Sequence, residues 1–121
     1  MLEVIDKGSV SASHPAPLLF VHGAWHAAWC WDEHFLEFFA SRGYRAMALS
    51  FRGHGNSPLD KRLRDCSFAD YVDDVTSVAG GLPARPVLIG HSMGAATVMM
   101  EAGAKNKLGV QGADAFAAYI A

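Results

Sequence analysis

The pentapeptide GHSMG at residues 90–94 holds the serine of this sequence that is best placed to do covalent chemistry. A serine hydroxyl is a weak nucleophile near neutral pH, and it reacts when a general base, usually a histidine oriented by a carboxylate, removes its proton. An apolar run at 85–90 predicts a strand before Ser92, and the apolar residues after it predict a helix. Gly-x-Ser-x-Gly between a strand and a helix is the pattern of a nucleophile elbow, so we predict that Ser92 is a catalytic nucleophile.

A second motif, HGAW at residues 22–25, follows another apolar run at 17–21. An oxyanion hole needs one backbone N–H from the residue after the nucleophile and another from the loop after an earlier strand. We therefore expect the N–H groups of Met93 and Ala24 to be these donors. Four of their neighbours are expected to line the pocket or to pack behind it: His22, Gly23, Trp25 and His91.

His22 and His26 have the H-x-x-x-H spacing of some metal ligands. They lie on a glycine-containing loop and no carboxylate accompanies them, whereas a metal site of this type needs a third ligand. We predict that the pair binds no metal.

Strand and helix signals alternate along the chain. The runs at 17–21, 45–51 and 85–90 lack polar alternation, which is typical of parallel strands covered on both faces, and residues 2–6 could add an edge strand. Helical periodicity extends over about 28–42 and from Ser67 to Gly80, and a third helix follows Ser92 and ends near 103–107. The fold class is therefore α/β, with a mostly parallel sheet.

The helical patterns also predict where several polar residues lie. Asp73 and Asp74 fall off the apolar stripe of the second helix, so we expect a solvated face there. Glu101 is expected on a helix surface or at an interface. Cys30 and Cys66 lie in no redox or nucleophile motif and are expected to pack in or near the core.

Composition narrows the class of protein. The chain has 121 residues, of which 51% are hydrophobic, which is enough for the core of one domain. A net charge of −2 argues against nucleic-acid binding, because the Lys and Arg residues are scattered except around Lys61, Arg62 and Arg64. The N-terminal segment carries Glu3 and Asp6 where a secretory signal would carry positive charge followed by an apolar core. No apolar run is long enough to span a bilayer. We predict a cytoplasmic protein that acts on a small molecule.

The motifs HGAW, RGHGNS at 52–57 and GHSMG together resemble the α/β-hydrolase family over residues 2 to about 104. The resemblance implies a serine esterase or lipase-like enzyme without a cofactor, whose substrate is a small ester or another acyl compound. It also implies that the RGHGNS loop is structural, through Arg52, Gly53, Gly55 and Ser57. In this family the order along the chain is serine, acid, histidine.

The sequence departs from that order, because all six histidines lie before or beside Ser92 and Asp114 is the only later aspartate. We therefore expect residues 1–121 to form a single, partial domain, equivalent to the amino-terminal half of the fold and truncated after the helix that follows Ser92. Residues from about 105 to 121 have an uncertain relationship to the family, although 116–121 could begin a further strand. His26 and His54 are candidate substitute bases, but the resemblance places no base at either position.

Three functions remain open at this point. The first is ester hydrolysis through an acyl-enzyme on Ser92. The second is another cofactor-free reaction on the same site, such as perhydrolysis, C–C bond hydrolysis or cyanohydrin cleavage. The third is a non-catalytic binding or assembly module. An apolar strand left at the edge of a truncated sheet would in addition favour a homo-oligomer.

Overall fold

The computed structural model describes the backbone of residues 1–107 and the side chains of residues 1–101. Four strands form one sheet in the spatial order β1-β3-β2-β4: β1 (Val4–Lys7), β2 (Leu18–Val21), β3 (Ala46–Leu49) and β4 (Val87–Gly90). The strands β3, β2 and β4 run parallel, as predicted, and β1 pairs antiparallel with β3 at the edge. The carboxyl ends of the three parallel strands consequently meet at one edge of the sheet.

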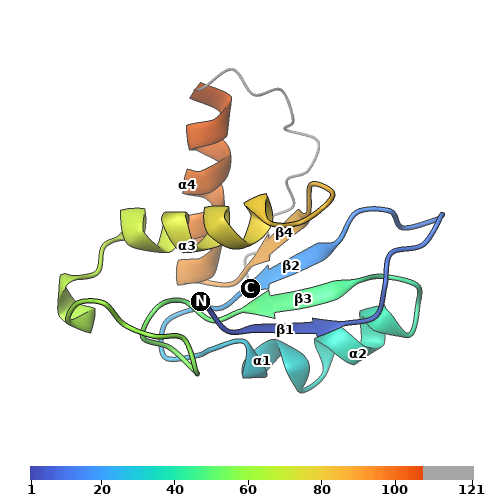
Figure 1. Cartoon of the computed structure of the whole chain (residues 1–121), viewed down its shortest axis with the longest axis horizontal. Coiled ribbons are helices and arrows are strands. Elements are labelled where there is room, and N and C mark those ends of the chain that lie inside the picture. The colour runs from blue at the N-terminus through green and yellow to red at the C-terminus, as the bar shows by residue number, and fades with distance from the viewer. Residues whose placement is uncertain (108–121) are drawn as a thin grey trace.

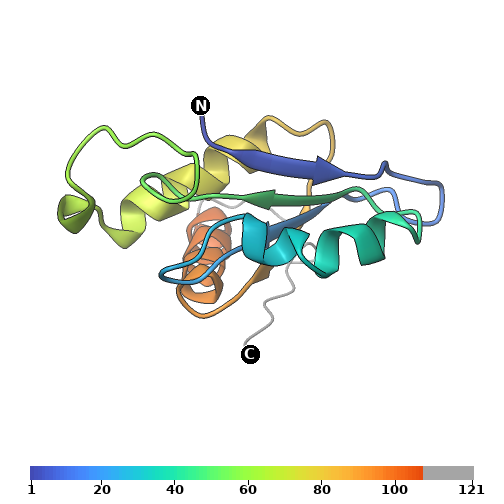
Figure 2. The same cartoon turned by 90° about the horizontal axis from the view of Figure 1, so that it is seen from below.

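Helices cover both faces of this sheet. Figures 1 and 2 show α1 (Trp29–Asp32) and α2 (Phe35–Ala40) on one side and α3 (Phe68–Gly80) and α4 (Met93–Lys107) on the other. Alternate side chains of each parallel strand enter two separate cores. In β2, Leu18 and Phe20 pack with α1 and α2, whereas Leu19 and Val21 pack toward α3 and α4. Burial on both faces explains why these strands show no polar alternation in the sequence.

One predicted helix is wrong in its extent. The periodic segment at 28–42 forms two short helices, α1 and α2, rather than one. The backbone leaves the helical region at His34, which has φ −137° and is the N-cap of α2. This break lets Trp31 and Leu36 enter the same core, where Trp31 packs edge-on against Phe35 with ring centroids 5.3 Å apart.

The second predicted helix is confirmed as α3. Its start is fixed by a capping box, because the Ser67 hydroxyl accepts a hydrogen bond from the Asp70 N–H and the Asp70 carboxylate accepts one from the Ser67 N–H. The prediction of a solvated Asp74 is wrong. Asp73 is exposed, but Asp74 is only 4% exposed and pairs with Arg52.

For Glu101 the expected helix-surface position is wrong, because its side chain is 2% exposed and accepts a hydrogen bond from the Thr76 hydroxyl of α3 at 3.2 Å. It therefore lies between α3 and α4. Val98 of α4 is fully buried, whereas Met99 and Met100 are 51% and 47% exposed. The expected strand at 116–121 lies outside the described residues. Within residues 1–107, β2 is the one strand that pairs with β4.

Cys30 and Cys66 are free thiols, half-buried against the two cores, as expected. In the part of the chain that the structure describes, no helix has the length and apolar character needed to cross a membrane.

Candidate active site

Ser92 stands at a sharp turn between β4, which ends at Gly90, and α4, which begins at Met93. Its φ is +56°, a left-handed backbone that costs a residue other than glycine about 1–2 kcal/mol. The side chain is exposed at the carboxyl edge of the sheet. Such strain persists where the surrounding structure fixes it, and it is concentrated at functional sites.

The flanking glycines allow this turn to pack closely. A Cβ on Gly94 would stand 2.5 Å from the carbonyl oxygen of His22 and would overlap that of Val21. A Cβ on Gly90 would stand 2.5 Å from the carbonyl oxygen of Gly94. These neighbours are backbone atoms, which have little freedom to move. The G-x-S-x-G spacing therefore lets α4 start directly against the end of β2.

The loop after β2 meets this turn. A Cβ on Gly23 would lie 3.1 Å from both the Ser92 Cβ and the His91 carbonyl oxygen, so the HGAW loop approaches the Ser92 turn too closely for a side chain to fit between them. Ala24 follows Gly23 and is exposed. Met93 is the first residue of α4, where backbone N–H groups have no partner within the helix. The structure thus brings the two predicted motifs together at one edge of the sheet.

His22 is fully buried and both of its ring nitrogens are hydrogen-bonded to backbone groups. Nδ1 donates to the Gly23 carbonyl oxygen at 2.7 Å, and Nε2 accepts from the Phe51 N–H at 3.0 Å. The Phe51 N–H can only donate, so the neutral ring carries its proton on Nδ1. Burial lowers the pKa of His22 to about 4. This residue fastens the HGAW loop to the end of β3 and is not free to act as a base or as a metal ligand.

The remaining histidines near this edge are also held by the backbone. His91 is half-buried, packs against Gly23, and donates its backbone N–H to the Val21 carbonyl oxygen at 3.1 Å. The Nδ1 atoms of His26 and His54 contact the carbonyl oxygens of Ala24 and Arg52, each at 3.0 Å. Among the described residues, none of these ring hydrogen bonds reaches Ser92.

A hydrogen-bonded group that the sequence patterns did not reveal holds the segment between the HGAW motif and α1. The Ser50 hydroxyl is buried, donates to the Glu3 carboxylate at 2.6 Å, and accepts from the Ala28 N–H at 2.9 Å. Glu3 also accepts from the Asn56 side chain at 2.6 Å. The Ser50 hydrogen bond is the main cause of the lowered pKa of Glu3. No local signal could have identified Glu3, because its partners come from loops some 50 residues away.

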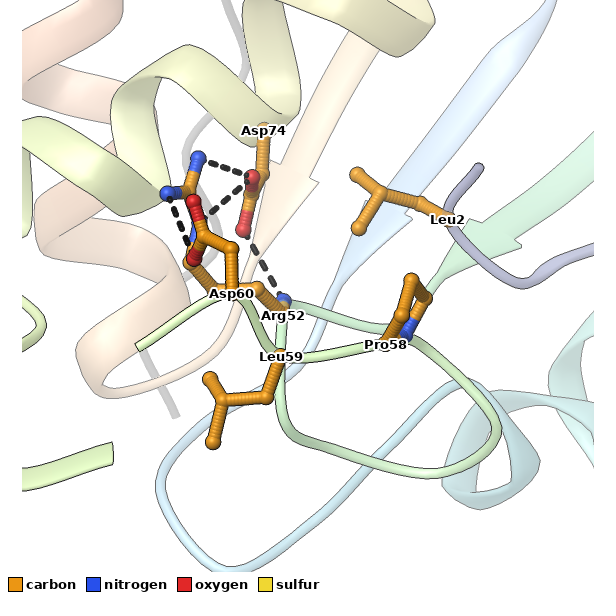
Figure 3. Close-up of a pocket in the computed structure, with 6 residues that line it drawn as sticks. All are labelled: Leu2, Arg52, Pro58, Leu59, Asp60 and Asp74. Carbon is orange, nitrogen blue, oxygen red and sulfur yellow. Dashed lines mark hydrogen bonds and ion pairs between the residues drawn. The ribbon is translucent and has the colours of Figure 1, made fainter. Parts of the chain in front are cut away.

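The loop after β3 is held by a second polar cluster. Figure 3 shows Asp74 accepting from the Arg52 side chain, with Nη2 at 2.8 Å and Nε at 3.0 Å, and from the Arg52 backbone N–H at 2.9 Å. Asp70 and Asp60 lie 3.4 and 3.8 Å from the same guanidinium. These carboxylates raise the pKa of Arg52, and the Asp74 hydrogen bond is the largest cause. These interactions hold the Arg52 side chain against α3 and thereby fix the RGHGNS loop.

A cavity of about 240 Å³ lies beside this cluster. It is lined by Leu2, Arg52, Pro58, Leu59, Asp60 and Asp74, and none of the predicted site residues is among them. Within the described residues, no group of three or more His, Cys, Asp or Glu side chains is arranged to hold a metal ion.

The geometry agrees with comparisons to known proteins. A family model described as "Alpha/beta hydrolase family" matches residues 18–121. The chain belongs to the alpha/beta hydrolase family. A solved thioesterase domain from the curacin biosynthetic pathway superposes with a TM-score of 0.72 at 30% identity, over 86% of this chain and 37% of that one.

Two curated relatives indicate the range of chemistry among similar alpha/beta hydrolases. Protein phosphatase methylesterase 1 of Mus musculus is 36% identical over 98 residues, which are 78% of this chain and 25% of that protein. Non-heme chloroperoxidase of Streptomyces lividans is 40% identical over 83 residues, which are 68% of this chain and 29% of that protein. This alpha/beta hydrolase chain therefore spans less than a third of the length of either relative.

Proposed function

We propose that this protein hydrolyses carboxylic esters through an acyl-enzyme on Ser92. The observation that carries the proposal is the close approach of Gly23 to the strained Ser92 turn, where a Cβ on Gly23 would lie 3.1 Å from the Ser92 Cβ. This approach supports an HGAW loop beside an exposed hydroxyl, which is the arrangement an oxyanion hole requires. The relative named a methylesterase further supports an ester as substrate.

In the proposed reaction, Ser92 Oγ attacks the ester carbonyl carbon and loses its proton to a base. The carbonyl oxygen becomes an oxyanion, which accepts hydrogen bonds from the N–H groups of Ala24 and Met93. Collapse of this intermediate expels the alcohol with one proton and leaves an acyl-Ser92 ester, which water then hydrolyses to the acid. We assign no base within residues 1–101, because both ring nitrogens of His22 are hydrogen-bonded to the backbone and the ring hydrogen bonds of His26 and His54 do not reach Ser92.

The test is covalent labelling of the 121-residue chain with a fluorophosphonate probe, followed by mass spectrometry. Because no base is assigned, we expect the adduct to form slowly, to be confined to Ser92 and to be absent in Ser92→Ala. Ala24→Pro, which removes one N–H donor, should slow labelling about 10²-fold or more if it stays folded. Without a base, turnover of a nitrophenyl ester should be weak. No adduct on Ser92 in a folded chain would refute the proposal and favour a non-catalytic module.

The relative named a non-heme chloroperoxidase favours a second candidate reaction on the same serine. In perhydrolysis, hydrogen peroxide replaces water as the acceptor of the acyl group, so that acetic acid and peroxide give peracetic acid and water. Peracid formation that depends on Ser92 and exceeds ester hydrolysis would identify this activity.

The sheet edge supports a proposal about assembly. In the described residues β4 has a partner strand on one side, and Met99 and Met100 of α4 are half-exposed. Unpaired strand edges and apolar patches promote association between chains. We propose a homo-oligomer joined at this edge, and a concentration-independent monomer in light scattering would contradict it.

A further inference from the structure

The loop after β2 carries an unusual group of aromatic residues. Trp25 is 93% exposed and Trp29, at the start of α1, is 54% exposed. His26 lies between them in the sequence and is also exposed, and its ring packs on Trp29 with centroids 5.8 Å apart. Single exposed apolar side chains are common on protein surfaces. Several large ones close together mark a binding or interaction site more often.

Trp25 has a second distinguishing feature, which is its backbone. Its φ is +66°, and a bulky residue in the left-handed region is a genuine outlier. Within residues 1–107, Trp25 and Ser92 are the two residues other than glycine with positive φ. Glycine would adopt this conformation without strain, so the sequence keeps an indole at a position that favours another residue type. An observed outlier of this kind is a reason to look for function.

The position of Trp25 relative to Ser92 suggests what that function is. Gly23 lies close to the Ser92 side chain, since a Cβ on Gly23 would stand 3.1 Å from the Ser92 Cβ, and Trp25 is two residues further along. Consecutive Cα atoms are 3.8 Å apart, so the Trp25 Cα lies within about 8 Å of the Gly23 Cα. Trp25 also directly follows Ala24, the proposed oxyanion donor. An ester bound with its carbonyl at Ala24 would have its substituents within reach of the Trp25 indole.

We infer that Trp25, on the segment that also carries the His26–Trp29 ring pair, binds an aromatic ring of the substrate, so that the preferred esters carry a ring next to the reacting carbonyl or on the alcohol. This inference rests on the proposed function for the identity of the reacting group. Planar rings stack on indole in offset or edge-on geometry and gain free energy beyond the area that they bury. The site thus distinguishes an aromatic ring from a saturated ring of similar size.

The test uses binding rather than turnover. Ser92→Ala prevents acylation, so esters can serve as stable probes, and ligand-observed NMR gives their apparent Kd. The first matched pair is benzyl acetate and cyclohexylmethyl acetate, and the second is methyl phenylacetate and methyl cyclohexylacetate. We expect the aromatic member of at least one pair to bind about two- to tenfold more tightly.

Variants at Trp25 then assign the preference. In the Ser92→Ala background, Trp25→Gly should reduce the preference to about unity without unfolding the loop, because glycine tolerates φ +66°. Trp25→Phe should retain part of it. Phe38→Ala is the matched control, since Phe38 is an aromatic of α2 that is 49% exposed and lies under the Arg42 guanidinium. The control should leave the preference unchanged.

The two proposals fail in different ways. Equal binding of both members in both pairs, or a preference that survives Trp25→Gly, would overturn the aromatic site even if a fluorophosphonate labels Ser92. An aromatic preference that depends on Trp25, in a chain whose Ser92 resists the probe, would support the aromatic site and refute acyl transfer.

Discussion

The pairing of Asp74 with Arg52 makes a stability prediction that separates two adjacent carboxylates. Replacement by asparagine in Asp74→Asn preserves volume but removes the charge and one acceptor oxygen. The carboxylate, which is 4% exposed, accepts three hydrogen bonds from Arg52, two of them from the guanidinium. An asparagine NH₂ must face either the Arg52 backbone N–H or its guanidinium, and both are donors. At least one hydrogen bond is therefore lost and replaced by a donor–donor contact.

The magnitude follows from the burial of the pair. Removing one partner of a fully buried ion pair costs about 3–5 kcal/mol, and hydrogen bonds to charged groups contribute about 1.5–3 kcal/mol. The Arg52 side chain is 19% exposed, and in the variant it would still have the Asp70 carboxylate 3.4 Å away. The loss should therefore be smaller than for a fully buried pair with no other partner. We expect Asp74→Asn to reduce the free energy of unfolding by about 2–3 kcal/mol. With an m-value of about 2 kcal/mol per M, the urea midpoint should fall by about 1–1.5 M.

The control is the same substitution one residue earlier. Asp73 is exposed on the same helix, and Asp73→Asn should change the free energy of unfolding by less than about 0.5 kcal/mol. Both variants and the parent are compared by circular dichroism in urea at equal protein concentration. Equal midpoints for Asp74→Asn and Asp73→Asn would show that the Arg52 pair does not hold the RGHGNS loop.

Three further predictions concern packing and pH. Gly94→Ala should destabilise the chain by about 1–3 kcal/mol in urea unfolding, because its Cβ meets backbone carbonyls, whereas Gly80→Ala, with no atom within 4 Å of the new Cβ, should not destabilise it. The pKa of Glu3 is lowered from 4.5 in the folded chain, so its contribution to stability is complete above pH 4.5 and is lost as the pH falls through the pKa of the folded state. In thermal melts, the melting temperature of Glu3→Gln should therefore fall less steeply with acidification than that of the parent. The pKa of His22 is lowered from 6.5 to about 4, so the unfolded chain binds more protons in this window, and stability should decline from pH 6.5 toward 4. Long-range ¹H–¹⁵N NMR should show His22 neutral with its proton on Nδ1 throughout most of that window, and a charged ring near pH 6 would contradict the buried hydrogen-bond pair.

The sequence by itself determined the fold class and the location of the candidate site. Apolar runs without alternation identified the parallel strands, and helical periodicity from Ser67 to Gly80 identified α3, because both are local signals. The GHSMG motif predicted a turn between a strand and a helix, and the backbone atoms around Gly90 and Gly94 explain why glycine stands at both positions. Family membership followed from the same motifs.

The tertiary structure decided which polar side chains are buried and what they hold. Asp74 was expected on a solvated face, and Glu101 on a helix surface or at an interface, but both side chains are buried. Periodicity identifies the apolar face of a helix and does not show which elements pack against its other faces. Arg52 reaches Asp74 from a loop 22 residues earlier in the chain, and Thr76 reaches Glu101 from another helix.

The same reason applies to the site itself. Two motifs about 70 residues apart predicted Ser92 and the HGAW loop, but only the parallel pairing of β2 with β4 brings Gly23 against Ser92. Which ring nitrogen of His22 carries the proton likewise depends on the hydrogen bond from Phe51, a residue just after β3. The same bond leaves the ring unavailable as a base. Local sequence patterns record the geometry of one element at a time, whereas the contacts between elements depend on the register and packing that only the folded chain provides.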